Sequence, residues 1–374
     1  MDGEGHGGRS GGNCLSRRDL LKVAAWGVGA AGARVVGAGV AAVSVIRAGV
    51  RGADLSFVPQ LEAAGAVYRH ASGAVLDPLV LVRSRGVNLV RLRLWHTPAG
   101  GWCGLARTVA MAQRARVLGM GVLLDVHYSD TWADPGVQTP PAAWAGLSGA
   151  GLRSAVRAYT RDVLVAMAGA GVWPAMVQLG NEVTDGMLWP HGRVSGAGWG
   201  AFAAVYGAAR DGVDDAAVSA GRVRPGVVLH TDRGGDNAGA RWFYDNAVAQ
   251  GMRFDTVGLS YYPWWHGGLA ACVANVEDLR WRYGREVMVV ETAYPWTLGW
   301  NDNEHNVVGL VTQLLPGYAA TPGGQLAFLS SLDVGLVGAG AAGWCYWAPE
   351  WVAAPGVGSA WENLAWFGFD GRLL

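Results

Sequence analysis

Short apolar runs alternate with longer amphipathic or alanine-rich segments along most of this chain. The apolar runs are residues 52–56, 89–95, 121–127, 176–182, 227–230, 256–261, 287–291 and 343–347. They are apolar on both faces, which is typical of strands in a parallel sheet that is covered on both sides. The intervening segments that predict helices are residues 105–118, 152–168, 202–216, 237–249, 269–283 and 325–336.

Eight strands joined by helical crossovers over this length predict a single (β/α)8 barrel of the TIM type. A doubly wound open sheet is the alternative that shares the same alternation. The barrel is favoured because polar side chains follow nearly every apolar run, at the end where a barrel builds its site. Residues 48–374 contain no linker and no internal repeat, so we expect them to form one domain.

The first 47 residues read as an export signal. Arg17 and Arg18 precede a weakly hydrophobic stretch that is rich in alanine and glycine. This order resembles a twin-arginine signal, and Arg34 interrupts the apolar stretch, which favours a cleaved signal over a retained anchor. Cleavage anywhere in residues 33–48 fits the sequence. The prediction is a secreted protein with no stable membrane association after export.

Residues 27–32 within this signal spell G-x-G-x-x-G, and Asp54 follows at about the distance that a dinucleotide fingerprint requires. The fingerprint needs a buried strand before its glycines, because those glycines make a strand-to-helix turn. Arg17 and Arg18 stand there instead. We therefore expect no nucleotide cofactor, and an oxidoreductase is disfavoured.

The composition excludes several other classes. The chain has 29 basic and 29 acidic side chains, so it has no positive field for nucleic acid. A hydrophobic content of 51% excludes a disordered chain. Only Cys103, Cys272 and Cys345 remain after export, and the sequence leaves their pairing open. We expect a monomer.

Polar side chains recur with the strand period of two near the predicted barrel mouth. Arg91 and Arg93 fall on one face of their strand, and Asp125 and His127 share a face of the next. A packed apolar core has no need of such a layer. The pattern therefore indicates a functional site at the carboxyl ends of the strands.

Two glutamates are the sharpest chemical signal. Glu182 and Glu291 each appear as an apolar strand ends, on strands four and seven, and Asn181 precedes the first. Those strand ends lie across a barrel mouth from each other. Glycoside hydrolysis needs two such carboxyl groups, one protonated to assist the leaving oxygen and one ionised. The pair predicts a glycoside hydrolase.

The surrounding motifs resemble those of glycoside hydrolase family 53, the endo-β-1,4-galactanases that cut the galactan of pectic arabinogalactan. The resemblance runs from residue 52 to about residue 351. Its most specific motifs are residues 125–135, 178–182, 260–267 and 291–295.

The resemblance implies a retaining barrel hydrolase with Glu182 as acid/base and Glu291 as nucleophile. It also implies that Asn181 binds the sugar 2-hydroxyl, that Tyr261 or Tyr262 supports the nucleophile, and that Trp347 floors the cleft. The full set of expected substrate-binding residues is Asp54, Arg91, Arg93, His127, Asp134, Asn181, Tyr261, Tyr262 and Trp347. No metal belongs to this catalytic set.

Some family members hold calcium in the loop after strand seven. Here Asn301–Asn306 offers oxygen atoms but few carboxylates, so a structural calcium is only an option. A related barrel enzyme acting on mannan or glucan is the alternative activity, since the catalytic carboxylates are shared. A carbohydrate-binding derivative without catalysis is disfavoured because both glutamates are present.

Two expectations concern the cleft itself. Trp95, Trp132, Trp265 and Trp347 fall near strand ends, so we expect at least two of these indoles to be accessible in an open groove. Arg93, together with the hydroxyl of Tyr261 or Tyr262, is expected to hold Glu291 ionised.

Overall fold

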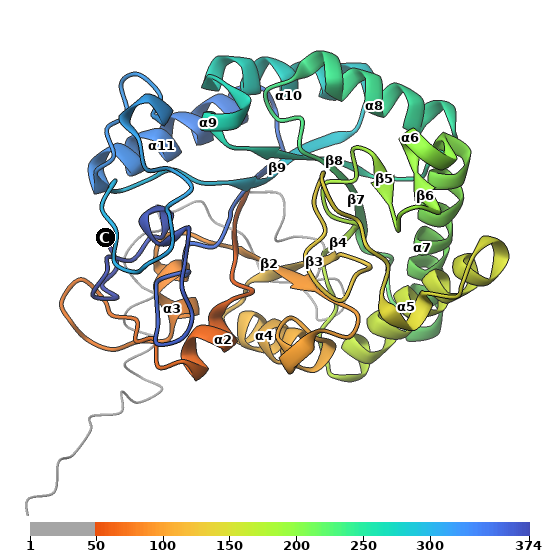
Figure 1. The fold of residues 1–374 in the computed structure, drawn as a ribbon, viewed down its shortest axis with the longest axis horizontal. Helices are drawn as coiled ribbons and strands as arrows, with labels where there is room; N and C mark the ends of the chain where they lie inside the picture. The colour runs from red at the N-terminus through yellow and green to blue at the C-terminus, as the bar shows by residue number, and fades with distance from the viewer. Residues whose placement is uncertain (1–48) are drawn as a thin grey trace, which may run out of the picture. The chain divides into compact units, whose positions relative to one another are not determined.

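The structure, a computed structural model, describes residues 49–374; the predicted export signal and the glycine motif at residues 27–32 lie outside them. Eight parallel strands close into a barrel in the order β1-β10-β9-β8-β7-β4-β3-β2, as predicted (Figure 1). The strands are β1 Val50–Asp54, β2 Leu89–Leu94, β3 Gly121–Val126, β4 Met176–Leu179, β7 Gly226–Thr231, β8 Thr256–Tyr261, β9 Glu286–Thr292 and β10 Gly343–Tyr346. The open doubly wound sheet is thereby excluded.

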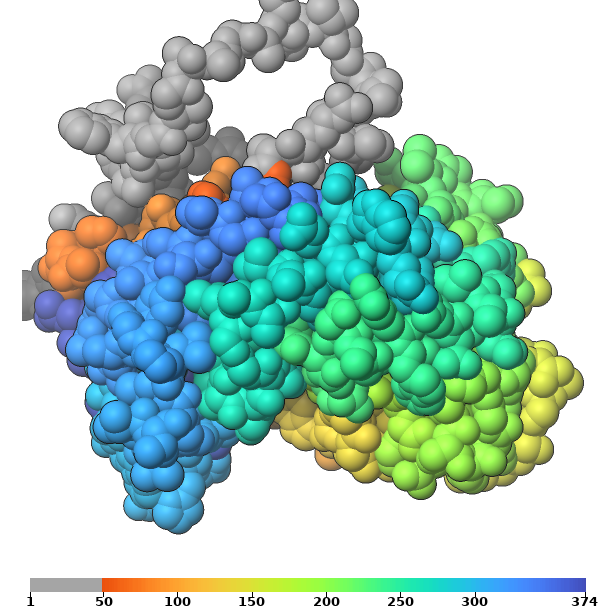
Figure 2. Space-filling model, turned by 90° about the horizontal axis from the view of Figure 1, so that it is seen from above, coloured from red at the N-terminus to blue at the C-terminus, as the bar shows by residue number. Residues whose placement is uncertain are grey.

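Six long helices surround the barrel, and each was predicted within a few residues. They are α4 Leu105–Val117, α5 Gly149–Gly169, α7 Trp199–Ala220, α8 Asn237–Ala249, α10 Leu269–Tyr283 and α11 Pro322–Gly338. Figure 2 shows the green to blue parts of the chain, which contain α8, α10 and α11, as one continuous outer surface. Among the described residues, no helix is long and apolar enough to cross a membrane.

The first crossover differs from the others, because two short helices replace one long one. They are α2 (Val58–Ala63) and α3 (Pro78–Ser84). The Asp77 side chain accepts the Leu79 N–H at the start of α3, and Pro78 occupies the first helical position. Each helix has too few residues to show a helical period in the sequence, which is why neither was predicted.

Short helices and strands occur in the loops that follow the barrel strands. After β4 comes a hairpin of β5 (Gly186–Met187) and β6 (Gly192–Arg193). The remaining short elements are α6 Val194–Ala197, α9 Pro263–His266, η2 Ala99–Gly101, η3 Ala142–Trp144, η4 Val311–Gln313 and η5 Glu362–Leu364.

The barrel interior is layered. Its lower layer is apolar and consists of Val50, Leu89, Leu123, Met176, Val228, Met288, Val290 and Cys345. Two residues further along four of these strands stand Arg91, Asp125, Gln178 and His230, all buried. Since side chains two apart share a face of a strand, these groups form a polar layer directly above the apolar one.

Two strands differ from the prediction by more than one residue at an end. β1 covers residues 50–54 instead of 52–56, and β4 ends at Leu179 instead of residue 182. Gly180 has a φ of 85° and leaves the strand conformation. The chain therefore turns before it reaches Glu182, and the glutamate lies on a loop above the strand.

Candidate active site

Glu182 stands just beyond the end of β4 on a strained backbone. Its φ is 47°, a left-handed conformation that residues other than glycine rarely adopt. A Cβ atom on Gly180 would lie 2.6 Å from Cγ1 of Val183, so only glycine fits the turn that precedes it. Backbone strain of this kind is concentrated at functional sites. Glu182 is half-buried and lines a cavity.

Glu291 lies near the end of β9 and is 5% exposed. Its Oε1 atom is 2.8 Å from Nη2 of Arg91, and its Oε2 atom accepts a hydrogen bond of 2.8 Å from the Tyr262 hydroxyl. Both contacts favour the ionised carboxylate.

Arg91 is the centre of a buried charge cluster. Besides Glu291, its guanidinium pairs with Asp54 at 2.8 Å and with Asp125 at 2.9 Å, and it donates to Oδ1 of Asn181 at 2.9 Å. The Arg91 side chain is 1% exposed, so desolvation of these charges is costly and the close contacts compensate for it. Asp54 and Arg91 therefore lie beneath the cleft and act on Glu291 and Asn181.

The two glutamates have different proton affinities. Burial raises the pKa of Glu182 well above its ordinary value, and the negative charges of Glu291 and Asp232 raise it further. Burial also raises the pKa of Glu291, but Arg91 and the Tyr262 hydroxyl act against that rise. Glu182 therefore holds a proton at a pH where Glu291 is ionised.

The Asn181 side chain is fixed by four contacts, one of which joins its Oδ1 atom to Nδ1 of His230 at 3.1 Å. Its Oδ1 atom accepts from Arg91 and from Nε2 of Gln178 at 3.2 Å, and its Nδ2 atom donates to the carbonyl of Ala133 at 2.9 Å. The amide is 6% exposed and its orientation is set by this network. It borders Glu182, as the motif requires.

Arg93 does not contact Glu291, contrary to the expectation that its charge would hold this carboxylate ionised. The Arg93 guanidinium stacks 4.1 Å above the ring of Trp132 and 4.6 Å from that of Phe57, and it donates to Sγ of Cys103 at 3.4 Å. Arg91 lies two residues earlier on the same face of β2. It contacts the carboxylates instead, because it stands at the same depth in the barrel as they do.

His127 and Asp134 lie in the wall formed by the loop after β3. His127 pairs with Asp125 at 3.0 Å through Nε2, and its Nδ1 atom accepts the N–H groups of Trp95 and Ala133. Asp134 lines the cavity beside Glu182, and its Oδ1 atom accepts the Gly136 N–H at 2.7 Å.

The two neighbouring tyrosines at the end of β8 point in different directions. The Tyr262 hydroxyl reaches Glu291, whereas the Tyr261 hydroxyl donates to the carbonyl of Gly267 at 2.8 Å. Tyr262 is therefore the residue beside the candidate nucleophile, and Tyr261 packs into the wall.

Indoles line the mouth of the barrel. Trp132 is 36% exposed and Trp265 is 59% exposed, while Trp95 is half-buried and Trp347 is only 8% exposed. Two accessible indoles meet the expectation for an open groove. A cavity of about 680 Å³ lies at this mouth. Its lining includes Asp134, Glu182, Asp232, Tyr262 and Trp265.

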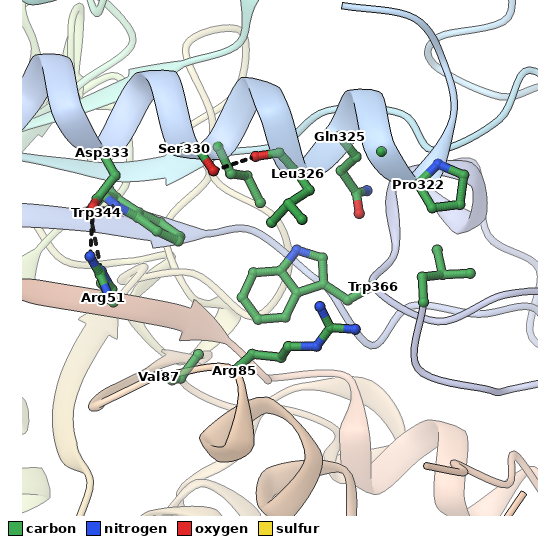
Figure 3. A pocket seen from close by; sticks show the side chains of 13 residues that line it. Arg51, Arg85, Val87, Pro322, Gln325, Leu326, Ser330, Asp333, Trp344 and Trp366 are labelled. Carbon is green, nitrogen blue, oxygen red and sulfur yellow. Dashed lines mark hydrogen bonds and ion pairs between the residues drawn. The ribbon is translucent and has the colours of Figure 1, made fainter. Parts of the chain in front are cut away.

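A second cavity, of about 390 Å³, lies between α11 and the amino-terminal ends of β1 and β10 (Figure 3). Its lining includes Trp344 and Trp366, and an ion pair of 2.6 Å joins Arg51 to Asp333. Barrel enzymes act at the opposite end of their strands. This cavity also lacks a second carboxylate, so it is not the candidate active site.

In the loop proposed for calcium, the carboxylate of Asp302 accepts backbone N–H groups. Oδ1 and Oδ2 of Asp302 accept the N–H groups of Glu304 and Ser359, each at 2.7 Å. Across residues 49–374, no cluster of three or more histidine, cysteine or acidic side chains could hold a metal ion. The structure thus gives no support to calcium at Asn301–Asn306.

The three cysteines of the described chain, Cys103, Cys272 and Cys345, are buried free thiols.

Three buried polar residues near the barrel mouth were given no role from the sequence: Gln178, His230 and Ser260. Each is 0% exposed and lies within hydrogen-bonding distance of another of the three. His230 stands at the end of a predicted apolar strand. The two glutamates were identified by the same position, so this signal could also have identified His230.

The comparisons with known proteins agree with this geometry. The sequence model of Glycosyl hydrolase family 53 matches residues 50–374. A protein of Niallia circulans, described as an uncharacterized protein in the bgaB 5′ region, is 44% identical over 87% of this chain and 91% of its own. An arabinogalactan endo-beta-1,4-galactanase of Cellvibrio japonicus is 37% identical over 84% of this chain and 85% of its own. The Ignisphaera aggregans GH53 catalytic domain is 36% identical, with a TM-score of 0.83 over 91% of this chain and 97% of that domain.

Proposed function

Because the chain belongs to glycoside hydrolase family 53, we propose that it is a retaining endo-β-1,4-galactanase in which Glu182 is the acid/base and Glu291 the nucleophile. The observation that carries the assignment is the contrast between the two carboxyl groups. Glu291 contacts Arg91 and Tyr262, which favour its charge, while Glu182 has Glu291 and Asp232 nearby, which disfavour its own.

The proposed reaction has two steps. In the first, a carboxylate oxygen of Glu291 attacks the anomeric carbon, the glycosidic C–O bond breaks, and the leaving oxygen takes the proton of Glu182. In the second, water attacks the anomeric carbon, passes a proton to Glu182, and the ester bond to Glu291 breaks. Both glutamates return to their starting states.

The other residues of the site support this chemistry. The free hydrogen of the Asn181 amide is placed to meet a sugar hydroxyl, and Trp132 and Trp265 provide flat apolar faces for sugar rings. Asp134 borders the same cavity. His127, Trp347, Asp54, Arg91 and Arg93 act from below by holding these groups in place.

The two carboxylate roles are tested by azide rescue on an activated aryl galactoside. Glu291→Ala should lose activity, and azide should restore part of it as a glycosyl azide of inverted configuration. Glu182→Ala should give the glycosyl azide of retained configuration. If the two configurations are exchanged, the roles are exchanged.

The substrate assignment is tested separately. Reducing-end release is measured side by side on linear β-1,4-galactan, mannan, xylan and carboxymethyl-cellulose, and ¹H NMR of the first product reports its anomeric configuration. Galactan should be preferred, and the first product should be the β-anomer. Faster release from mannan or glucan would favour the alternative barrel glycanase.

We further propose that residues 1–47 are an export signal and that residues 48–374 act as a secreted monomer without a required cofactor. Replacing Arg17 and Arg18 by lysine should block secretion by the twin-arginine route. Light scattering of the purified protein should give the mass of one chain.

A further inference from the structure

The cavity of about 680 Å³ at the barrel mouth is lined by Glu182 but not by Glu291. Its walls come from the loops after β3 and β7 and from residues 262–266 after β8. In the proposed first step the acid gives its proton to the oxygen of the leaving sugar, so that sugar lies on the side of the acid. The cavity volume falls within the roughly 300–1,000 Å³ that is usual for small-molecule sites.

One hydrogen-bond donor of this cavity is the imidazole of His266, the last residue of α9. Its Nδ1 atom accepts the N–H of Tyr262 at 2.9 Å. Burial lowers the pKa of His266, and the charges of Asp232 and Asp236 oppose this only in part, while Arg233 acts with burial. The ring is therefore neutral at neutral pH, and a neutral ring whose Nδ1 accepts carries its proton on Nε2. Within the described chain no hydrogen bond occupies Nε2, so this N–H is available to a ligand.

The backbone around His266 is closely packed. Gly235, in the loop after β7, lies against it, and a Cβ atom at that position would overlap the carbonyl oxygen of His266. The His266 N–H also donates to the carbonyl of Tyr262 at 2.8 Å. The imidazole is thus held in place without a ligand, which lowers the entropic cost of binding one.

The cavity also contains an acceptor, the carboxylate of Asp232 just beyond the end of β7. Its Oδ1 atom accepts the Thr184 hydroxyl and lies 3.4 Å from Nε of Arg233, which also pairs with Asp236. Among the described residues Oδ2 has no partner, and the side chain, 22% exposed, lines the cavity. The indole of Trp265, which is 59% exposed, lines it too. A donor, an acceptor and a flat apolar face therefore border one space beside the acid.

We propose that this cavity binds the leaving galactosyl residue, whose ring packs on Trp265 and whose hydroxyls donate to Oδ2 of Asp232 and accept from Nε2 of His266. Each sugar hydroxyl can both donate and accept, so these groups match a pyranose. The proposal rests on the retaining function given above. In the second step the same subsite holds a sugar acceptor in place of water. The acceptor oxygen attacks the anomeric carbon, its proton passes to Glu182, the ester bond to Glu291 breaks, and a new glycosidic bond forms.

The first test compares two substrates in the His266→Asn variant. The asparagine Oδ1 atom can still accept the N–H of Tyr262, but the Nε2 donor is lost. On linear galactan the leaving group is a sugar, and kcat/KM should fall about tenfold. On an aryl β-1,4-galactobioside with a good leaving group no leaving-sugar hydroxyl is present, and kcat/KM should not change. Equal falls on both substrates, or no fall on galactan, would overturn the subsite.

His70→Asn is the matched control. The Nδ1 atom of His70 also accepts a backbone N–H, that of Ser72 at 3.2 Å, but His70 does not line the cavity. This variant should leave kcat/KM on both substrates unchanged. Urea unfolding of both variants shows whether a loss of activity comes with a loss of stability.

The second test measures acceptor binding. A galactobiosyl fluoride with fluorine at C2 of its reducing sugar should leave a stable ester on Glu291, seen by mass spectrometry. Galactobiose should release this ester by transfer, at a rate that saturates with its concentration. His266→Asn and Asp232→Ala should each need about tenfold more galactobiose for half of the maximal rate.

The outcomes of the second test separate the two proposals. If no ester forms on Glu291, the retaining role of that residue is overturned, and the comparison of galactan with the aryl substrate still decides the subsite. If the ester forms but galactobiose releases it no faster than water does, the leaving-sugar subsite alone is overturned.

Discussion

One guanidinium, that of Arg91, faces three carboxylates at 2.8 to 2.9 Å in the mouth of the barrel. Burial alone would favour the neutral form of Asp125 and Glu291, and Arg91 opposes this for both. Burial also acts against ionisation of Asp125, yet Arg91 and His127 outweigh it and lower the pKa of Asp125. A buried cluster of this kind is costly to form and costly to break, so its value lies in the charge it maintains on Glu291.

The tyrosine pair gives a prediction at the residue scale. Tyr262→Phe removes a hydrogen bond to ionised Glu291, which raises the pKa of that carboxyl. Since Glu291 must be ionised to attack, the acidic limb of the kcat/KM profile should move up by about one pH unit. Tyr261→Phe is the matched control, because its hydroxyl binds Gly267 instead. Equal shifts for both variants would contradict the assignment.

Arg93 contacts the aromatic side chains of the barrel mouth and not Glu291. Its guanidinium lies 4.1 Å from the ring of Trp132, which is the exposed indole nearest to His127 in the groove.

Replacing Arg93 by methionine should therefore raise KM for galactan by about 2-fold to 30-fold, the range for loss of a cation–π contact of about 0.5–2 kcal/mol. The acidic limb of the pH profile should stay in place, because Glu291 keeps Arg91. A loss of kcat with unchanged KM would return Arg93 to the catalytic charge cluster.

At the scale of elements, the end of β4 determines where the acid/base stands. The strand stops at Leu179, Gly180 turns the chain, and Glu182 follows in a left-handed conformation. His230 on β7 then holds the N–H groups of residues 182 and 183. The loop is thus tied to the neighbouring strand of the barrel at the point where the chemistry takes place.

Gly180→Ala tests this turn. The added Cβ would meet Cγ1 of Val183 at 2.6 Å on a backbone with φ of 85°, so we expect a loss of stability of about 1–3 kcal/mol and a larger relative loss of kcat. Urea unfolding and turnover on galactan provide the two measurements. In the interior of α7, Gly207→Ala meets no atom within 4 Å and should instead stabilise the protein by about 0.5–1 kcal/mol.

At the scale of the whole molecule, exposed tryptophans occur on two different surfaces. Trp132 and Trp265 face the barrel mouth, on the loops after β3 and β8. Trp281, which is 85% exposed, belongs to α10 on the outer wall (Figure 1). Of these three, only Trp132 and Trp265 stand on loops at the end of the barrel that holds Glu182 and Glu291.

Trp132→Ala and Trp265→Ala should each raise KM for long galactan about tenfold, because sugar stacking on an indole is lost, with a smaller effect on short oligosaccharides. Trp281→Ala should leave both values unchanged. The measurement compares initial rates on galactan and on galactotriose. An effect of Trp281→Ala equal to that of Trp265→Ala would indicate general destabilisation and not loss of a binding surface.

The alternation of apolar strands and amphipathic helices was sufficient to predict the barrel, because burial of a parallel strand on both faces leaves a local mark in the sequence. The same is true of Glu182, which follows a buried strand, and of Glu291, which lies near the end of one. The short helices α2 and α3 were missed, since six or seven residues hold too little of a helical period.

Choices between neighbouring residues were decided only by the tertiary structure. Arg91 and Arg93 share a strand face, so the period of two could not tell which one lies at the depth of Glu291; the closed barrel places Arg91 there. The register between β8 and β9 shifts between Leu259 and Ser260, so that Ser260 pairs with Glu291, and the hydroxyl of Tyr262, not that of Tyr261, reaches the carboxylate. Strand depth and register depend on contacts between segments far apart in the chain, and for this reason no local pattern of residues encodes them.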